Sequence, residues 1–346
     1  MTPLSGPLAR YGVDAAEALA LWADEAARLP PQAPRVRLTR FDAHPRSARG
    51  MRAALATHPD LVFGPYGTGP AIAALEAAEN RLVWNHGGSA SAISWRRFRN
   101  VVNVPTPATR YLRGVLEAVR EADPNVGSAV LLHAATTFGR DVASGASDTA
   151  AELGLTLTSR ACPRGNAAAV AAELPAADVL LVAAGPEDEL AAADILLRRR
   201  WRAAAFVSAG VAEVLASIGD RLDGVLGPAQ WMPEVAPIPD EGPPADWFVD
   251  RYRSRTGRVP SYPAAQAFAA GLLAARCVRE AGVPPRDDAL LACAKRLDCT
   301  TLYGRFGLDP ETGHQRLHVL ITVQWQNGRR IPVWPPDLAR QPVTLH

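Results

Sequence analysis

Residues 61–91 read LVFGPYGTGPAIAALEAAENRLVWNHGGSAS, and the rest of the chain is organised around this stretch. Two short apolar runs, 61–63 and 82–84, each end in a loop of small residues, and an Ala-rich helical segment joins them. Short buried strands with a helical crossover predict a parallel sheet. Both loops then leave the same carboxyl edge of that sheet, where open α/β folds bind ligands.

The two loops carry groups that suit a small anionic ligand. Their glycines let a ligand approach the backbone closely. Thr68 and Ser89 add hydroxyl groups, and free N–H groups at the helix starts that follow favour anions such as carboxylates. We therefore interpret these loops as half of a small-molecule site.

Composition sets the class of protein. The chain has 346 residues, of which 48% are hydrophobic and 21% charged, which is typical of a globular protein with room for two domains. A net charge of +2 gives no electrostatic indication of a nucleic-acid partner. No apolar run approaches the roughly 20 residues of a membrane span.

The cysteines indicate neither a metal site nor a redox motif. None of Cys162, Cys277, Cys293 and Cys299 forms a CxxC, and no cysteine–histidine cluster has zinc spacing. Buried free thiols are the default interpretation, although spacing alone leaves the disulfide state open. We expect no cofactor and no metal.

The first 104 residues read as one α/β lobe. The expected elements are a helix from about Asp14 with an apolar face of Leu19, Trp22, Ala26 and Leu29, a strand at 36–41, a helix at 47–56, the organising stretch, and a strand at 101–104. Pro105-Thr106-Pro107 then interrupts this alternation of strands and helices, and we place a first crossing between lobes there.

A second series of strands and helices follows. The expected strands are 129–132, 155–158, 178–182, 204–207 and 225–227. The expected helices are 112–121, one that follows Gly139 and ends at about Leu153, one that follows Pro186 and ends at about Arg199, and one after Gly210. Repeated strands, small-residue loops and helices predict a second doubly wound lobe.

The remaining chain returns to the first lobe and ends on the second. Helices are expected at 245–256, 264–281 and 287–296, and a hairpin turn at Asn327-Gly328 joins strands 317–326 and 331–334. The predicted lobes are residues 1–104 with 236–310, and 105–235 with 311–346. Three crossings form a hinge, and a ligand cleft is expected between the lobes.

Several motifs in this order resemble a known family. They are Leu4-Ser5-Gly6-Pro7 with Tyr11-Gly12, 64–68, 84–89, Phe138-Gly139, Gly219-Asp220 with Asp223-Gly224, and Val323-Gln324-Trp325 with Gly328. Together they resemble the type I solute-binding proteins of the leucine/isoleucine/valine-binding family, which serve ABC importers. The resemblance implies two Rossmann-like lobes that close on a ligand without chemistry. We expect this ligand to be small and polar, either amino-acid-like or bearing a carboxylate or an amide. It also implies an extracytoplasmic location and a permease partner.

The resemblance also implies site residues. Thr68 matches the hydroxyl that holds a ligand carboxylate, Gly87 and Ser89 match the second loop, and Tyr11 and Tyr66 match positions that line a side-chain pocket. The full predicted set is Tyr11, Tyr66, Thr68, His86, Gly87, Gly88 and Ser89 in the first lobe and Phe138, Ala184 and Ser208 in the second.

Three features depart from the family pattern or leave alternatives open. Only Met1 to Pro3 precede the LSGP loop, so the first strand of lobe one is expected to be missing. Amino-acid binders place a carboxylate near Val207-Ser208 to meet a ligand ammonium, and none stands there. Glu187 or Asp188 either supplies this carboxylate in its place or caps a helix at the surface. His86 is either a ligand contact or a structural residue.

Other functions fit less well. A dehydrogenase needs G-x-G-x-x-G and an acidic residue about 20 positions later, and Gly67-Thr68-Gly69 lacks the third glycine. A hydrolase needs a G-x-S-x-G elbow, which the chain does not contain. The better rival is a cytosolic ligand sensor on the same fold. The lack of a visible secretory signal favours this sensor role. The protein is expected in the cytoplasm if Met1 is the true start.

Overall fold

The computed structural model describes residues 1–25, 35–211 and 214–345. It divides the chain into unit 1, Met1–Pro107 with Trp231–Val319, and unit 2, Ala108–Gln230 with Leu320–His346. The chain therefore passes from one unit to the other three times. The predicted lobe boundaries were placed after residues 104, 235 and 310, near these passages.

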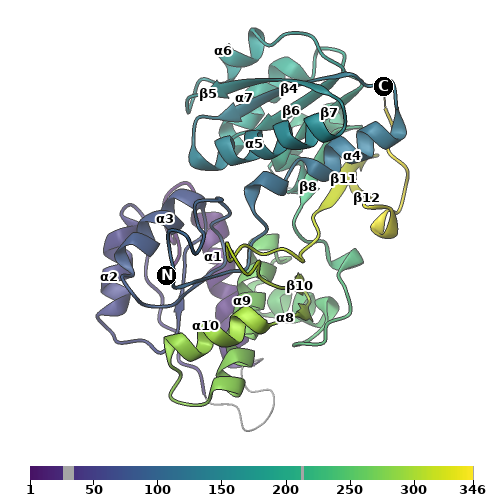
Figure 1. The fold of residues 1–346 in the computed structure, drawn as a ribbon. Helices are drawn as coiled ribbons and strands as arrows, with labels where there is room; N and C mark the ends of the chain where they lie inside the picture. The colour runs from purple at the N-terminus through teal and green to yellow at the C-terminus, as the bar shows by residue number, and fades with distance from the viewer. Residues whose placement is uncertain (26–34, 212–213, 346) are drawn as a thin grey trace. The chain divides into compact units, whose positions relative to one another are not determined.

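Unit 1 is built on a small parallel sheet. Its order is β1 (Val62–Phe63), β2 (Val83–Asn85) and β3 (Val101–Asn103), and every residue of these strands is buried. Its helices are α1 (Ala9–Asp24), α2 (Ser47–Leu55), α3 (Thr68–Ala77), α8 (Ala245–Thr256), α9 (Tyr262–Ala281) and α10 (Asp287–Arg296) (Figure 1). The organising stretch thus forms the predicted strand, helix and strand.

The sheet of unit 1 separates two hydrophobic clusters. The larger one joins α1, α8, α9 and α10 to one face and contains Trp22, Phe248 and Phe268. The smaller one joins α2 and α3 to the other face around Met51. Strands buried on both faces explain why these segments are continuous apolar runs without alternation.

Four expectations for unit 1 need correction or completion. Helix α1 begins at Ala9, before Asp14, and the predicted face residues Ala26 and Leu29 lie outside the described residues. Residues 36–41 form no strand, because within the described chain they have no neighbouring strand to pair with. Turns, and no helix, follow the second loop. A hairpin of β9 (Cys299–Thr301) and β10 (Gly304–Phe306) was not predicted.

Unit 2 is a seven-stranded mixed sheet. Its order is β12-β11-β8-β7-β6-β4-β5, with β4 (Ser128–Ala134), β5 (Thr156–Cys162), β6 (Val179–Ala183), β7 (Ala203–Phe206), β8 (Leu226–Ala229), β11 (Ile321–Gln326) and β12 (Arg329–Trp334). Strand β11 runs antiparallel to both its neighbours, and the hairpin at Asn327-Gly328 is confirmed.

Helices cover both faces of this sheet. Helices α4 (Arg113–Ala122) and α5 (Thr137–Glu152) pack on one face. Helices α6 (Ala167–Ala172) and α7 (Pro186–Leu196) pack on the other (Figure 1). Helix α6 was not predicted. The helix expected after Gly210 is wrong where it can be checked, since residues 216–222 form a 3-10 segment, while residues 212 and 213 lie outside the described residues.

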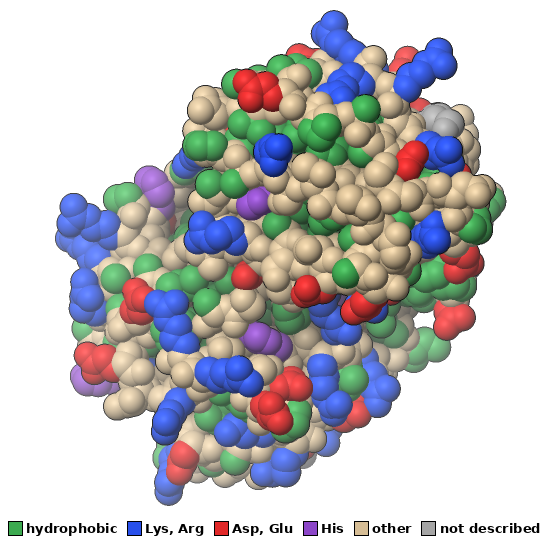
Figure 2. Space-filling model, turned by 45° about the horizontal axis from the view of Figure 1, so that its top comes forward, with side chains coloured by type: hydrophobic (Ala, Val, Ile, Leu, Met, Phe, Trp, Pro, Cys, Tyr) green, Lys and Arg blue, Asp and Glu red, His purple; other side chains and the backbone are tan. Residues whose placement is uncertain are grey.

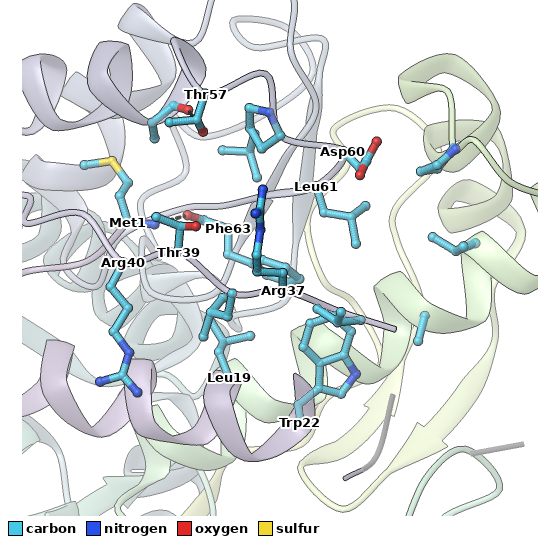
Figure 3. Close-up of a pocket in the computed structure, with 18 of the residues that line it drawn as sticks. Met1, Leu19, Trp22, Arg37, Thr39, Arg40, Thr57, Asp60, Leu61 and Phe63 are labelled. Carbon is cyan, nitrogen blue, oxygen red and sulfur yellow. Dashed lines mark hydrogen bonds between the residues drawn. The ribbon is translucent and has the colours of Figure 1, made fainter. Parts of the chain in front are cut away.

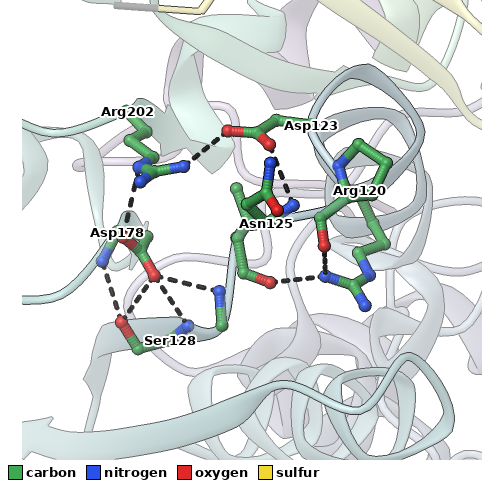
Figure 4. Close-up of polar contacts among 9 residues, drawn as sticks. Arg120, Asp123, Asn125, Ser128, Asp178 and Arg202 are labelled. Atoms are coloured by element: carbon green, nitrogen blue, oxygen red, sulfur yellow. Dashed lines mark hydrogen bonds and ion pairs between the residues drawn. The ribbon is translucent and has the colours of Figure 1, made fainter.

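A polar cluster fixes the amino-terminal edge of this sheet (Figure 4). The Asp178 carboxylate accepts hydrogen bonds from the backbone N–H groups of Gly127 and Ser128, both at 3.0 Å, and from the Ser128 hydroxyl at 2.9 Å. Arg202 approaches it to 3.3 Å. These hydrogen bonds, led by the one from Gly127, lower the pKa of Asp178. One carboxylate therefore joins the segments that open β4, β6 and β7.

The charged surface is mixed. On the face shown in Figure 2, basic and acidic side chains lie interspersed. Among the described helices, none is long and apolar enough to cross a membrane.

Candidate functional site

The two predicted loops of unit 1 contact each other directly. The Gly67 backbone N–H donates to the Gly87 carbonyl at 3.0 Å, and the Ser89 N–H lies 3.4 Å from the Thr68 hydroxyl. A Cβ atom at Gly87 would lie 2.4 Å from the Tyr66 Cα. Glycine is required here because two backbones pass in contact. The structure therefore brings Tyr66, Thr68, Gly87 and Ser89 together.

Helix α3 begins at the first of these loops. Its first residues, Thr68 and Gly69, have no residues one turn earlier in the helix to accept their N–H groups. The positive end of the helix dipole lies at the same place. The partly exposed Thr68 hydroxyl stands at this end, so the loop offers donors to an anion.

Three tyrosines lie beside these loops. The rings of Tyr11 and Tyr66 are 4.9 Å apart, and those of Tyr66 and Tyr262 are 6.3 Å apart. The Tyr66 and Tyr262 hydroxyls share a short hydrogen bond. Tyr262 opens helix α9 and was missed by the sequence analysis, because no local pattern connects it to a residue 196 positions earlier.

His86 and Gly88 face the interior of unit 1. The His86 side chain is wholly buried, and within the described chain neither ring nitrogen has a hydrogen-bond partner. Burial lowers the pKa of His86 to about 3, so the imidazole is neutral. Asn85 accepts the Gly88 N–H at 2.8 Å. The structural alternative for His86 is the one that its burial favours, and its role as a ligand contact stays a prediction.

In unit 2 a buried carboxyl group supports two of the predicted positions. Glu189 accepts the Ala184 N–H at 2.9 Å through one oxygen and the Ser208 N–H at 2.8 Å through the other. The side chain is inaccessible to solvent, and this burial raises the pKa of Glu189 to about 8. The sequence analysis weighed Glu187 and Asp188 for this region and missed the neighbouring Glu189.

Phe138 belongs to a separate aromatic contact of unit 2. Its ring meets that of Tyr111 edge to face at 5.4 Å, and the Tyr111 hydroxyl accepts a hydrogen bond from the Gln230 amide at 2.7 Å. Tyr111 and Gln230 lie close to two of the passages between units. Neither was predicted as a site residue.

The four cysteines are buried and free. Burial raises the pKa of each thiol, to about 12 for Cys299. The described residues contain no group of three or more His, Cys, Asp or Glu placed to hold a metal ion.

Comparison with known proteins gives a consistent match over nearly the whole chain. A family model described as periplasmic binding protein matches residues 1–330. No curated protein matches the chain.

Solved structures share the fold at low sequence identity. A leucine-, isoleucine-, valine-, threonine- and alanine-binding protein from Brucella ovis, in a closed conformation, is 15% identical with a TM-score of 0.80, covering 99% of this chain and 96% of that one. The leucine-binding protein LivK from Thermotoga maritima is 14% identical with a TM-score of 0.78, covering 97% of each chain. An ABC transporter solute-binding protein from R. palustris, in complex with benzoate, is 16% identical with a TM-score of 0.78, covering 96% and 93%.

Proposed function

Because the chain belongs to the periplasmic binding protein family, with the type I fold of that family, we propose that it binds a small carboxylate without chemical conversion. The bound solute would be delivered to the permease of an ABC importer. The ligand would lie against the loops of unit 1, and Phe138, Ala184 and Ser208 of unit 2 stay predicted ligand contacts.

One observation carries this proposal. The Thr68 hydroxyl, the start of α3 and the Ser89 backbone meet at one point, beside the rings of Tyr11 and Tyr66. A carboxylate suits the donors, and an apolar or aromatic body suits the tyrosine rings. A site with both features recognises the two ends of a small organic acid.

The ligand class follows from the acidic groups near the predicted contacts of unit 2. An amino acid carries an ammonium group, which needs a paired negative charge once buried. Glu189 is wholly buried, and both its oxygens accept backbone N–H groups. We therefore favour a carboxylate without an ammonium group, such as the benzoate bound by the R. palustris protein, over the branched-chain amino acids.

The test is a calorimetric titration of the purified chain with benzoate, 4-hydroxybenzoate, leucine and valine. We expect binding of an aromatic acid and a loss in the variant Thr68→Val with Ser89→Ala. A hydrogen bond to a charged group contributes about 1.5–3 kcal/mol, so each substitution should weaken binding about tenfold to a hundredfold.

The matched control is Ser254→Ala, which removes an exposed hydroxyl from helix α8 and should leave affinity unchanged. Equal affinity in the double variant would refute the site. Preferred binding of leucine would refute the ligand class while leaving the site intact.

A cytosolic sensor on the same fold is the second candidate. It would bind the same ligand but would not support uptake. Uptake of the labelled ligand by cells with and without the gene separates the two roles.

A further inference from the structure

Helix α2 carries positive charge with which no acidic side chain of the described chain forms an ion pair. Arg46, immediately before the helix, and Arg49 and Arg52 within it are exposed and spaced three residues apart, so they lie on one face. Residues 43–59 contain these three arginines and no aspartate or glutamate. Because guanidinium groups stay charged at physiological pH, this face is a fixed patch of positive charge.

A surface hollow connects this patch to the loop that carries Thr68. Its volume is about 510 Å³, and the three arginines line it together with Gly69 and Pro70 in the first turn of α3. These two residues follow Thr68 directly in the chain. Among the described residues that line this arginine hollow, the arginines are the only charged ones. The patch therefore lies beside the donors that the proposed carboxylate would contact.

The acidic groups of the neighbouring segments have other partners. The Asp42 carboxylate accepts two backbone N–H groups, each at 2.9 Å, and the Ser5 hydroxyl at 2.6 Å. Glu76, near the end of α3, is paired with Arg97 at 2.6 Å. Neither carboxylate lines the arginine hollow, so neither neutralises its charge by direct contact.

A larger cavity of unit 1 has different chemistry (Figure 3). Its volume is about 620 Å³, and Leu19 and Trp22 of α1 supply apolar side chains. Arg40, which also lines it, is paired with Glu17 at 2.6 Å, and Asp60 adds a negative charge. That lining mixes apolar side chains with charges of both signs, whereas the arginine hollow carries charges of one sign.

We propose that the arginine hollow steers an anionic ligand onto the start of α3, an inference that rests on the proposed carboxylate site. The three guanidinium groups attract an approaching anion over about 8 Å at physiological ionic strength. They raise its concentration beside Thr68 and so speed association. They do not hold the bound ligand, so its dissociation is independent of them. A carboxylic acid is therefore captured faster than its neutral amide.

The test is stopped-flow fluorescence with benzoate and its neutral counterpart benzamide. In the variant Arg46→Gln with Arg49→Gln and Arg52→Gln, we expect the association rate of benzoate to fall about threefold to tenfold at about 10 mM salt. At about 0.5 M salt, where the charges are screened, the difference should fall below about twofold. The dissociation rate of benzoate and both rates of benzamide should stay unchanged.

A matched control removes the same charge elsewhere. Arg200→Gln with Arg253→Gln and Arg329→Gln neutralises three exposed arginines that do not line the hollow, and it should leave association unchanged. Equal association rates in the unaltered chain and the α2 variant at low salt would overturn the proposal. So would faster dissociation from the α2 variant that persists in about 0.5 M salt, because the arginines would then hold the bound ligand.

Nuclear relaxation provides a readout that needs no bound ligand. An anionic and a neutral nitroxide of equal size are added in turn, and the relaxation of the exposed Gly69 amide proton is measured. We expect the anionic nitroxide to act at least about twofold more strongly at low salt, and this excess to vanish in the α2 variant. Equal relaxation by the two nitroxides would overturn the proposal. Failure of benzoate to bind would instead refute the ligand class and leave this readout intact.

Discussion

The carboxyl group of Glu189 accepts the backbone N–H of Ser208 at 2.8 Å, and both residues are buried. Its second oxygen accepts the N–H of Ala184. One side chain thus joins the loops that follow β6 and β7, and these loops carry two of the predicted ligand positions. The separation of the loops therefore depends on a group that never reaches the surface.

Removing this group should destabilise unit 2. Glu189→Ala leaves two buried N–H groups without an acceptor and a small void, and we expect a loss of about 2–4 kcal/mol in the free energy of unfolding. Urea denaturation measures it. Glu187→Ala is the control, because that side chain is 86% exposed and should change stability by less than about 0.5 kcal/mol. Equal losses in the two variants would contradict the structural role of Glu189.

The same carboxyl should make stability depend on pH. Its pKa rises from the ordinary 4.5 to about 8 in the folded chain because of burial. Between these values the folded state keeps a proton that the unfolded state has released, so stability falls as pH rises through this window. Glu189→Gln should flatten the slope between pH 5 and 8 in denaturation curves. An unchanged slope would show that other groups cause it.

The contact between the loops of unit 1 should not tolerate a methyl group at Gly87. Gly87→Ala places a Cβ atom 2.4 Å from the Tyr66 Cα, and we expect a loss of about 1–3 kcal/mol together with weaker ligand binding. The comparison is Gly185→Ala, where no heavy atom lies within 4 Å and the cost should stay below about 1 kcal/mol. Thermal denaturation and calorimetry of both variants check this.

The tyrosine pair should affect binding more than folding. Tyr262→Phe removes the hydroxyl that shares a hydrogen bond with Tyr66, and we expect a stability loss of about 1 kcal/mol. Because the Tyr66 ring then loses a fixed partner beside Thr68, ligand affinity should fall severalfold. Phe248→Leu, in the core of the same unit, should lower stability without a comparable change in affinity.

The Asp178 carboxylate, at the amino-terminal edge of the unit 2 sheet, should make the free energy of unfolding fall in acid. Asp178→Ala removes the acceptor for Gly127 and Ser128, at a cost of about 1–3 kcal/mol at pH 7. Since the folded pKa is lowered, this contribution is present above the unfolded pKa and is lost as pH falls through the folded value. Asp148→Ala, on the exposed face of α5, should show no such dependence in denaturation from pH 7 to 3.

The order of helices and strands was predictable where the signal is local. Apolar runs and small-residue loops located β1, β2, β4 and β6, and the Asn327-Gly328 turn located the final hairpin. Residues 36–41 have the composition of a strand, yet a strand exists only with a neighbour, and pairing is not written in the segment itself.

The candidate site shows the same limit. Thr68, Gly87 and Ser89 could be placed from their own loops, whereas the partnership of Tyr66 with Tyr262 spans 196 positions. Glu189 was missed because an acidic residue in the first turn of a helix usually caps it or faces solvent. Only the packing of α7 shows that this particular acid points inward.

The three passages of the chain between the units also constrain its synthesis. Unit 1 needs Trp231–Val319, so it cannot close until residue 319 has left the ribosome. Unit 2 is completed later still, because strand β11, which lies between β8 and β12 in its sheet, comes after residue 319 in the chain. Neither unit therefore has its full set of elements until most of the chain has been synthesised, unlike two domains encoded one after the other.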